Sequence, residues 1–281
     1  MSKWALVIDV VKCINCNNCV LSAKDEHDGN DFLGYAAAQP REAPPLIAMQ
    51  REVRGNGLVV DAAYMPVMCN HCDAPPCVKA AGDGSVYKRP DGIVIMDPER
   101  TKGRRDIVKS CPYKAIAWND ERQVPQTWIF DAHLLDQGWE RPRCAQACPT
   151  EAIAVVRRDD AALADLVKAE GLEVRHPEYR TRPRVFYKNM RPFLKRFVAA
   201  NVVATNDGRV DNVPGAIIRL FRDQQLVAET KTDAFGDFKI DDLDKKDAEY
   251  RLECSHGVFG LTKIAVMLDD SKYLGTLNLS A

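Results

Sequence analysis

The sequence lacks a long hydrophobic run and has no excess of either charge. Among its 281 residues, 39 are basic and 40 are acidic, so the formal net charge is -1. This balance gives no bulk electrostatic signal for nucleic acid or for an anionic membrane surface. The longest apolar stretches, such as residues 197–204, end well before the roughly 18 to 20 residues that a membrane-spanning helix requires. We therefore expect no membrane span and no nucleic-acid partner.

The N-terminus lacks the features of a secretion signal. Its apolar run is short, and neither a small-residue cleavage site nor a twin arginine follows the first methionine. The segment is more typical of a first β-strand, so we expect a cytoplasmic protein. Because 46% of the residues are hydrophobic, the chain has enough apolar residues for two or three folded domains.

Cysteine is abundant. The chain has 10 cysteines, and all but Cys254 lie in the first 148 residues. Disulfide frameworks belong to short secreted domains, whereas tight cysteine clusters in a chain without a signal indicate metal binding. The spacing of the cysteines therefore decides what they bind.

Eight of the cysteines form two sets with the same pattern. Each set has three closely spaced cysteines and one remote cysteine that is followed by proline. Bacterial ferredoxins hold [4Fe-4S] clusters in this way. We therefore predict two [4Fe-4S] clusters. The expected ligands are Cys13, Cys16, Cys19 and Cys148 for the first cluster, and Cys69, Cys72, Cys77 and Cys111 for the second.

Zinc is the main alternative, because Cys-x2-Cys pairs also build structural tetrahedral sites. It is strongest for the second set, where His71 lies between two cysteines. The Cys111-Pro112 pair favours a cluster, and we expect His71 to support the site without being a ligand.

The cysteine segments closely resemble the ferredoxin-like iron–sulfur subunits of the dimethyl sulfoxide reductase family of molybdopterin enzymes. The resemblance rests on five segments that stand in the family's order within residues 1–156. These are residues 13–19, 69–77, 89–98, 111–113 and 144–150. It implies a fold of two pseudo-symmetric ferredoxin-like halves, in which residues 69–118 form an inserted half.

The family has four clusters, and the resemblance shows which ligands this chain lacks. One further cluster would need cysteines at positions 23, 127 and 130 beside Cys144, but Ala23, Thr127 and Phe130 stand there. The other would need cysteines at four positions that hold Ala81, Thr101, Arg104 and Ile107. Cys144 and Cys254 are therefore expected to be buried and unligated.

The region after residue 156 changes in character. Asp159, Asp160 and Gly171 frame a helical pattern, and a basic, proline-rich connector follows, so residues 157–196 are expected to be a helix and a connector. Residues 197–281 alternate between apolar and polar positions, which indicates a β-sandwich. Residues 232–240 resemble the strand-turn-strand of transthyretin-like and Cna-B-like sandwiches, often used for docking. The expected fold class is α+β.

The combination of both halves is similar to the small subunits of the pyrogallol–phloroglucinol transhydroxylase group. This resemblance extends through residues 7–19, 91–98, 132–136 and 183–189. It implies a heterodimer or larger complex whose large subunit holds molybdenum bis-molybdopterin guanine dinucleotide and hydroxylates polyhydroxylated aromatics or transfers hydroxyl groups between them. This chain would transfer electrons and would contain no catalytic residue.

Two other functions remain open. The chain could serve a molybdoenzyme that reduces or oxidises another substrate, or it could be a free-standing ferredoxin with a β binding module. The charged residues do not favour any one of these functions over the others. We expect residues 25–27 to form a solvated turn without a catalytic role. Lys102, Arg104 and Arg105 are expected to be exposed or to pair with nearby carboxylates.

Overall fold

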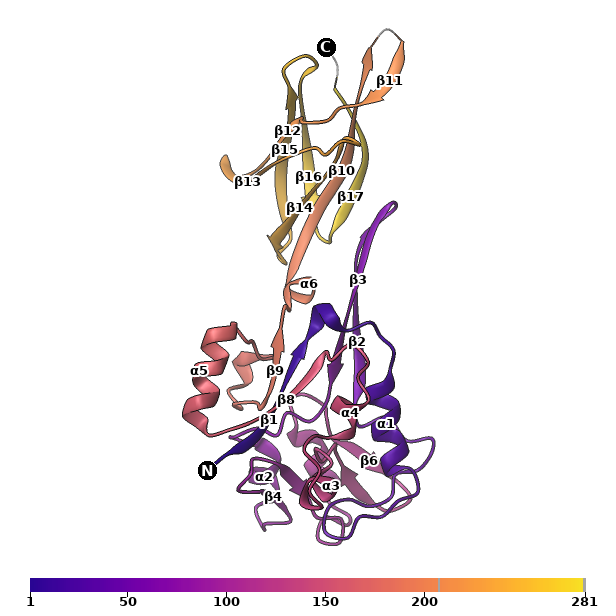
Figure 1. Ribbon diagram of the computed structural model, residues 1–281, viewed down its shortest axis with the longest axis vertical. Helices are drawn as coiled ribbons and strands as arrows, with labels where there is room; N and C mark the ends of the chain where they lie inside the picture. The colour runs from indigo at the N-terminus through magenta and orange to yellow at the C-terminus, as the bar shows by residue number, and fades with distance from the viewer. Residues whose placement is uncertain (207, 280–281) are drawn as a thin grey trace. The chain divides into compact units, whose positions relative to one another are not determined.

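The computed structural model describes residues 1–206 and 208–279 and has an α+β fold with mostly β-strands (Figure 1). It divides into two compact units. The first unit comprises Met1–Arg51 and Tyr64–Met190, and the second comprises Glu52–Ala63 and Arg191–Ala281. All ten cysteines are free, and eight of the nine in the first unit are the predicted ligands.

A three-stranded sheet organises the first unit. β1 (Lys3–Asp9) is central and pairs antiparallel with β8 (Ile153–Arg158) and parallel with β9 (Val185–Lys188). Both faces of β1 are buried, because Ala5 and Val7 pack towards α5 (Asp160–Glu170) while the alternate residues point the other way. The sheet therefore joins three segments that are far apart in the sequence.

Helix α5 confirms the helix expected after residue 158. The Asp159 side chain accepts a hydrogen bond from the Ala162 amide, and Gly171 ends the helix in the left-handed conformation. The connector differs from expectation, because Val185–Lys188 is strand β9. Its β-branched and aromatic residues favour a strand, but the surrounding prolines obscured that signal.

The rest of the first unit consists of short elements. These are the 3-10 helices η1 (Val10–Lys12), η2 (Arg105–Ser110) and η3 (Pro177–Tyr179), the helices α1 (Asn18–His27), α2 (Pro76–Ala81), α3 (Ala132–Asp136) and α4 (Arg143–Gln146), and the hairpins β4 (Val86–Lys88) with β5 (Val94–Met96) and β6 (Ala117–Asn119) with β7 (Val124–Gln126).

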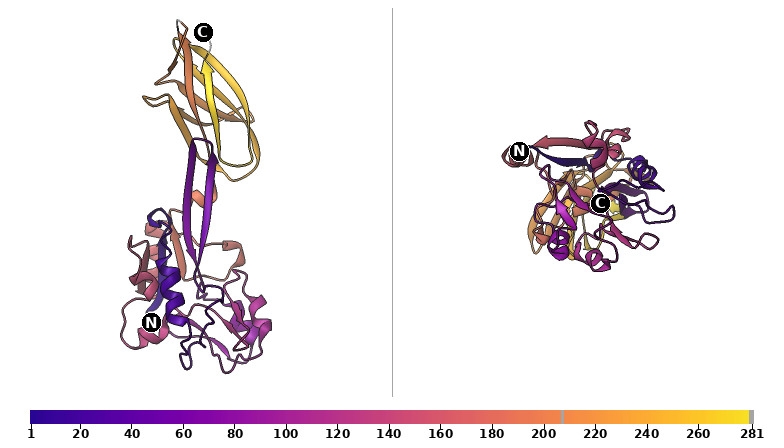
Figure 2. Two further views of the ribbon diagram at one scale, coloured as in Figure 1. Left: turned by 90° about the vertical axis from the view of Figure 1, so that its right-hand side faces the viewer. Right: turned by 90° about the horizontal axis from the view of Figure 1, so that it is seen from below.

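A long hairpin was not anticipated. β2 (Ala48–Asn56) and β3 (Val59–Val67) form one two-stranded ribbon (Figure 2). The turn signal lies at Gly55 and Gly57, which both adopt positive φ. A side chain at Gly55 would overlap the Val59 carbonyl oxygen, so the glycine is required there.

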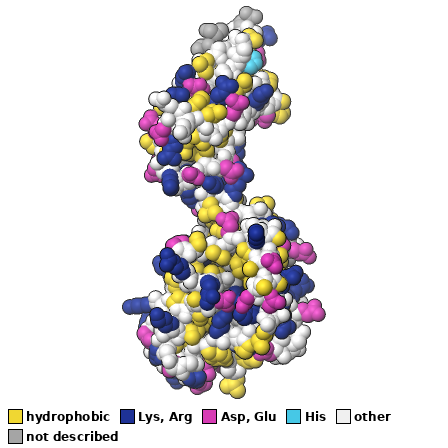
Figure 3. Space-filling model, turned by 90° about the vertical axis from the view of Figure 1, so that its left-hand side faces the viewer, with side chains coloured by type: hydrophobic (Ala, Val, Ile, Leu, Met, Phe, Trp, Pro, Cys, Tyr) yellow, Lys and Arg dark blue, Asp and Glu magenta, His cyan; other side chains and the backbone are white. Residues whose placement is uncertain are grey.

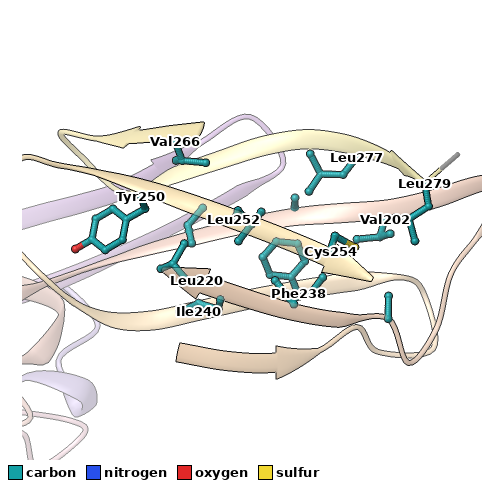
Figure 4. Close-up of a cluster of buried hydrophobic side chains, with 14 of the residues drawn as sticks. Val202, Leu220, Phe238, Ile240, Tyr250, Leu252, Cys254, Val266, Leu277 and Leu279 are labelled. Atoms are coloured by element: carbon teal, nitrogen blue, oxygen red, sulfur yellow. The ribbon is translucent and has the colours of Figure 1, made fainter. Parts of the chain in front are cut away.

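The second unit consists of two four-stranded sheets around one core. The first sheet contains β10 (Lys195–Asn206), β11 (Arg209–Asn212), β14 (Asp237–Asp244) and β17 (Lys272–Leu279). The second contains β12 (Ile217–Arg222), β13 (Gln225–Lys231), β15 (Ala248–His256) and β16 (Gly260–Leu268). Figure 4 shows side chains of both sheets, among them Phe238 and Leu252, that share one buried cluster.

The boundaries of the second unit differ from the expected 197–281. It starts at Arg191 with the short helix α6 (Arg191–Leu194), and it includes Glu52–Ala63 from the hairpin. Arg54 explains this inclusion, because its buried guanidinium pairs with Asp61 and Asp241 at 2.8 and 3.2 Å. It also lies over the ring of Phe197.

The surface shows no dominant charge on the face drawn in Figure 3, where acidic and basic side chains alternate with apolar areas. Within the described residues, no helix has the length and apolar character needed to cross a bilayer.

Candidate metal centres

The first three cysteines lie on a loop that the sequence bends sharply. Asp9 accepts a hydrogen bond from the Val11 amide and starts η1. Asn15 and Asn17 then adopt left-handed backbone conformations with φ of 60°, which asparagine tolerates better than most residues. Cys19 follows on the first turn of α1, so the loop surrounds one space with three thiols.

The remote Cys148 joins this set. Asn18 donates a hydrogen bond to the Ala147 carbonyl oxygen at 3.3 Å, and the Ala152 amide donates to the Cys148 sulfur at 3.3 Å. Burial, together with smaller effects of the three other thiols of the set, raises the pKa of the Cys19 thiol to about 12. The structure therefore brings together Cys13, Cys16, Cys19 and Cys148.

The second set repeats this design. His71 has a φ of 43° between Cys69 and Cys72, and Cys77 lies on the first turn of α2. Burial raises the pKa of the Cys69 thiol, and the thiols of the other three cysteines in the set add to the effect. The remote Cys111 ends η2. The structure therefore brings the second predicted set together as well.

The donor chemistry fits a cationic iron–sulfur cluster. Burial and the neighbouring thiols raise the pKa of Cys19 and of Cys69, yet the thiolate is the metal-binding form, so a bound cation would supply the compensating charge. Among the described residues, no three His, Cys, Asp or Glu side chains converge on a point suited to a single metal ion. The support for a cubane over zinc is the spacing of the cysteines, with three close thiols and a remote Cys-Pro in each set.

His71 has partners other than a metal in this structure. Its Nδ1 accepts a hydrogen bond from the Val94 amide at 3.0 Å and lies 4.0 Å from the Cys69 sulfur. The ring packs 5.5 Å from both Trp128 and Phe130, which stack on each other at 4.9 Å.

One position where the family has a further cluster is filled by these aromatic rings. Ala23, Thr127, Phe130 and Cys144 are all buried. The pKa of Cys144 is raised by burial and by its neighbours Asp131 and Cys19, so this filled position lies beside the first set. His71 belongs to the second set, which places the aromatic stack between the two sets.

The positions of the other set of missing ligands lie at a small apolar core, which an arginine side chain closes. Ile107 and Ala81 pack with Val86 and Val94. The guanidinium of Arg104 lies 3.4 Å from the Ala81 carbonyl oxygen and forms ion pairs with two aspartates, Asp83 at 3.1 Å and Asp106 at 2.9 Å.

The run 25–27 is not the solvated turn that the sequence suggested. It ends helix α1, and His27 is fully buried. Glu26 accepts a hydrogen bond from His133 at 2.7 Å and pairs with Arg143. Its pKa is lowered by these two partners in spite of burial. A polar run on a helix can point inwards when buried partners come from distant segments, which the local sequence cannot reveal.

Sequence reasoning also missed the segment that holds the second cysteine loop. The amides of Asp73 and Ala74 donate to the carbonyl oxygens of Arg182 and Thr181 at 2.8 and 2.9 Å. The buried Arg184 side chain binds both carboxylate oxygens of Asp73, at 2.7 and 2.8 Å. Arginines alternate with other residues along 180–184, and nothing in that pattern indicates which of them is buried.

Comparisons with known proteins agree with this geometry. A family model described as a 4Fe-4S dicluster domain matches residues 60–158. The pyrogallol hydroxytransferase small subunit of Pelobacter acidigallici is 39% identical over 99% of this chain and 100% of its own length. A tetrathionate reductase subunit of Salmonella typhimurium is 31% identical over 66% of this chain and 72% of its own.

Similarity to solved structures is weak. The 5-hydroxyisourate hydrolase of Klebsiella pneumoniae covers 30% of this chain and 92% of its own, with 15% identity and a TM-score of 0.26, which adds nothing to the fold described above. A sulfite dehydrogenase subunit of Allochromatium vinosum, at 30% identity over 66% of this chain and 83% of its own, extends the range of sequence relatives. The chain belongs to the iron–sulfur subunits of the dimethyl sulfoxide reductase family of molybdopterin enzymes.

Proposed function

We propose that this chain is the electron-transfer and structural subunit of a molybdopterin enzyme that acts on polyhydroxylated aromatic compounds. Catalysis takes place on a large partner subunit, which holds molybdenum bis-molybdopterin guanine dinucleotide. The observation that carries the proposal is the 39% identity to a pyrogallol hydroxytransferase small subunit along 99% of the chain. The relatives with other substrates align with about two thirds of this chain.

The chain holds two [4Fe-4S] clusters in this proposal. Each cluster, when bound, accepts and releases one electron. The ligands are Cys13, Cys16, Cys19 and Cys148 for the first cluster and Cys69, Cys72, Cys77 and Cys111 for the second. The protein's own contribution is to fix the thiolates, to cover the second set partly and to present Cys16 of the first set at the surface.

Electrons pass to and from the large subunit through the protein surface around the first set of cysteines. Cys16 is exposed, and three large aliphatic side chains of the same segment are exposed as well. Val11 is 70% exposed, and Ile14 and Leu21 are each 61% exposed. Exposed apolar side chains that surround a redox centre favour a dry protein contact, which shortens the path between two centres.

A second candidate is a subunit of a molybdoenzyme with another substrate, which the relatives named for tetrathionate and sulfite favour. A free-standing ferredoxin is less compatible with the comparisons, because the β-strand region also aligns with a protein named as a small subunit.

The test is purification of the native complex under anaerobic conditions, with iron and molybdenum analysis and two assays. We expect molybdenum and a larger subunit to copurify, and we expect pyrogallol consumption to exceed tetrathionate reduction. Val11→Asp with Ile14→Asp should weaken the complex, whereas Leu33→Asp, at a position of the first unit that is 89% exposed, serves as the control. Tetrathionate reduction without pyrogallol consumption would support the second candidate instead.

A further inference from the structure

A cavity of about 270 Å³ opens beside the second set of cysteines. One wall is apolar and is formed by Pro44, Pro45 and Leu46, with Met68 and Ile116 from other segments. Small-molecule sites are concave, mostly apolar and supplied with a few polar groups, and drug-sized ligands fill about 300 Å³ or more. The cavity therefore suits a ligand smaller than a drug molecule, of about one ring.

Two cationic side chains line the same cavity. Lys114 belongs to the turn after Cys111, and Arg175 lies some 60 residues further along the chain. Neither forms an ion pair with any residue of the part of the chain that the structure describes. Two cations without a carboxylate partner beside an apolar wall are complementary to an anion with an apolar body.

The backbone at Lys114 supports a binding role. This residue has a φ of 55°, in the left-handed region that residues with a side chain rarely adopt. Its amide donates to the Cys111 carbonyl oxygen at 3.1 Å. Strained backbone conformations of this kind cluster at ligand-binding positions. Lys114 lies at this turn and lines the cavity.

We propose that this cavity binds a small aromatic carboxylate. The ring lies against the proline and aliphatic wall, and the carboxylate accepts hydrogen bonds from Lys114 and Arg175. The planar fork of Arg175 suits the two carboxylate oxygens, and Lys114 supplies a second positive charge.

The site also acts on the second cluster, and this part rests on the proposed function. Met68 precedes Cys69, and Tyr113 follows Cys111 by two residues, so two residues of the cavity wall are close in sequence to predicted ligands of the second cluster. A bound anion opposes the arrival of an electron, so binding lowers the midpoint potential of the second cluster. By linkage, reduction of that cluster weakens ligand binding by the same factor.

Binding is measured on the intact complex by calorimetry, with benzoate as the probe and benzamide and inorganic phosphate for comparison. We expect one benzoate to bind per chain, and this binding should depend on Arg175. Benzamide and phosphate should bind at least about tenfold more weakly. Arg175→Gln and Lys114→Gln should each weaken this binding about tenfold or more, while Arg175→Lys retains most of it. Arg180→Gln removes a charge from the same connector outside the cavity and should bind as the wild type does.

Unchanged benzoate binding in both glutamine variants would overturn the site, and equal binding of benzamide would overturn the role of the charge. A redox titration followed by electron paramagnetic resonance tests the coupling: benzoate should lower the potential of the second cluster alone, and not in Arg175→Gln. Equal shifts of both clusters would overturn the coupling. A protein that binds benzoate through Arg175 but contains no clusters would refute the proposed function and leave the site standing.

Discussion

The two spare cysteines have surroundings unlike those of the eight predicted ligands. Cys144 and Cys254 are buried at 0% and 1% exposure. Burial alone raises the pKa of Cys254 to about 11, without the contribution from neighbouring thiols that the predicted ligands share. Cys254 has no thiol neighbour and Cys144 has one, Cys19, so neither belongs to a set of four thiols.

This contrast gives a prediction on iron content. The wild-type protein should contain about eight irons and eight sulfides, as two cubanes require. Cys111→Ala should reduce the iron to about four, because it opens one site and leaves the other closed. Anaerobic iron and sulfide analysis measures this, with Cys254→Ser as the matched control. A loss of iron in Cys144→Ser would show that the ligand assignment is wrong.

His27 predicts a pH dependence of stability. Burial lowers its pKa to about 4, and the charge of His133 reinforces the effect, while Glu26 opposes it. The unfolded chain, with a histidine pKa of about 6.5, binds the proton more readily. The stabilising contribution of neutral His27 is therefore complete above about pH 6.5 and is lost as the pH falls towards 4, by up to about 3 kcal/mol.

Urea unfolding of the anaerobic protein at pH 7 and pH 5 measures this change. His27→Phe should show a smaller loss of stability between the two values than the wild type. His176→Phe changes an exposed histidine and should keep the wild-type loss. Equal losses in all three proteins would contradict the role of His27.

At the scale of the elements, the stability of the second unit depends on one glycine. Gly236 has a φ of +77°, and a Cβ there would lie 2.5 Å from the Val202 carbonyl oxygen of β10. Gly236→Ala should therefore lower the free energy of unfolding by more than about 1 kcal/mol. Gly257 has open space around it, so Gly257→Ala should stay within about 0.5 kcal/mol of the wild type by urea unfolding. Similar losses in both variants would show that the contact at Gly236 is tolerated.

The elements also show what a sequence can predict. Helix α5 was predictable because Asp159 and Gly171 mark its ends locally, and the alternation of β12 and β15 marked them as strands. Strand β9 was not, because its four residues are held by pairing with β1, almost 180 residues earlier. Cysteine spacing identified the two sets, but the clamp between Arg184 and Asp73 depends on packing between distant segments.

At the scale of the whole molecule, the aromatic stack between the two sets predicts slow exchange of electrons. In the proposed function, Trp128 and Phe130 stand where the resemblance to four-cluster subunits would place an intermediate cluster, and tunnelling slows steeply with distance. After mixing with a low-potential donor, the first cluster should be reduced well before the second. Freeze-quench electron paramagnetic resonance follows both clusters. Matched rates within one turnover would contradict this and would favour a respiratory function.

The positions of the missing ligands beside Cys144 allow a gain-of-function test. Ala23→Cys, Thr127→Cys and Phe130→Cys together would complete a set of four thiols with Cys144. We expect the iron content to rise from about eight to about twelve and the second cluster to be reduced faster. Phe130→Leu is the control, because it loosens the stack without adding a ligand. A rise in iron without faster reduction would show that the stack does not limit transfer.

The second unit predicts a docking role. It has its own core and contains no predicted ligand. Removal of residues 191–281, with residues 52–63 replaced by a short turn, should keep about eight irons and weaken binding to the large subunit. The hairpin must be shortened because Arg54 would otherwise lose Asp241. Affinity measured by sedimentation or surface immobilisation gives the answer, and equal affinity with and without the unit would contradict the docking role.

The position of β1 at the centre of its sheet sets the order of events during synthesis. β1 ends at Asp9 and its partner β9 starts at Val185, so most of the first unit is made between them. At roughly 5 to 20 residues per second, the sheet must wait on the order of ten seconds or longer to close. The first set stays incomplete until Cys148 has been made, so Cys13, Cys16 and Cys19 lack their predicted fourth partner for most of that interval. Iron therefore enters this protein late, once most of the chain has been made.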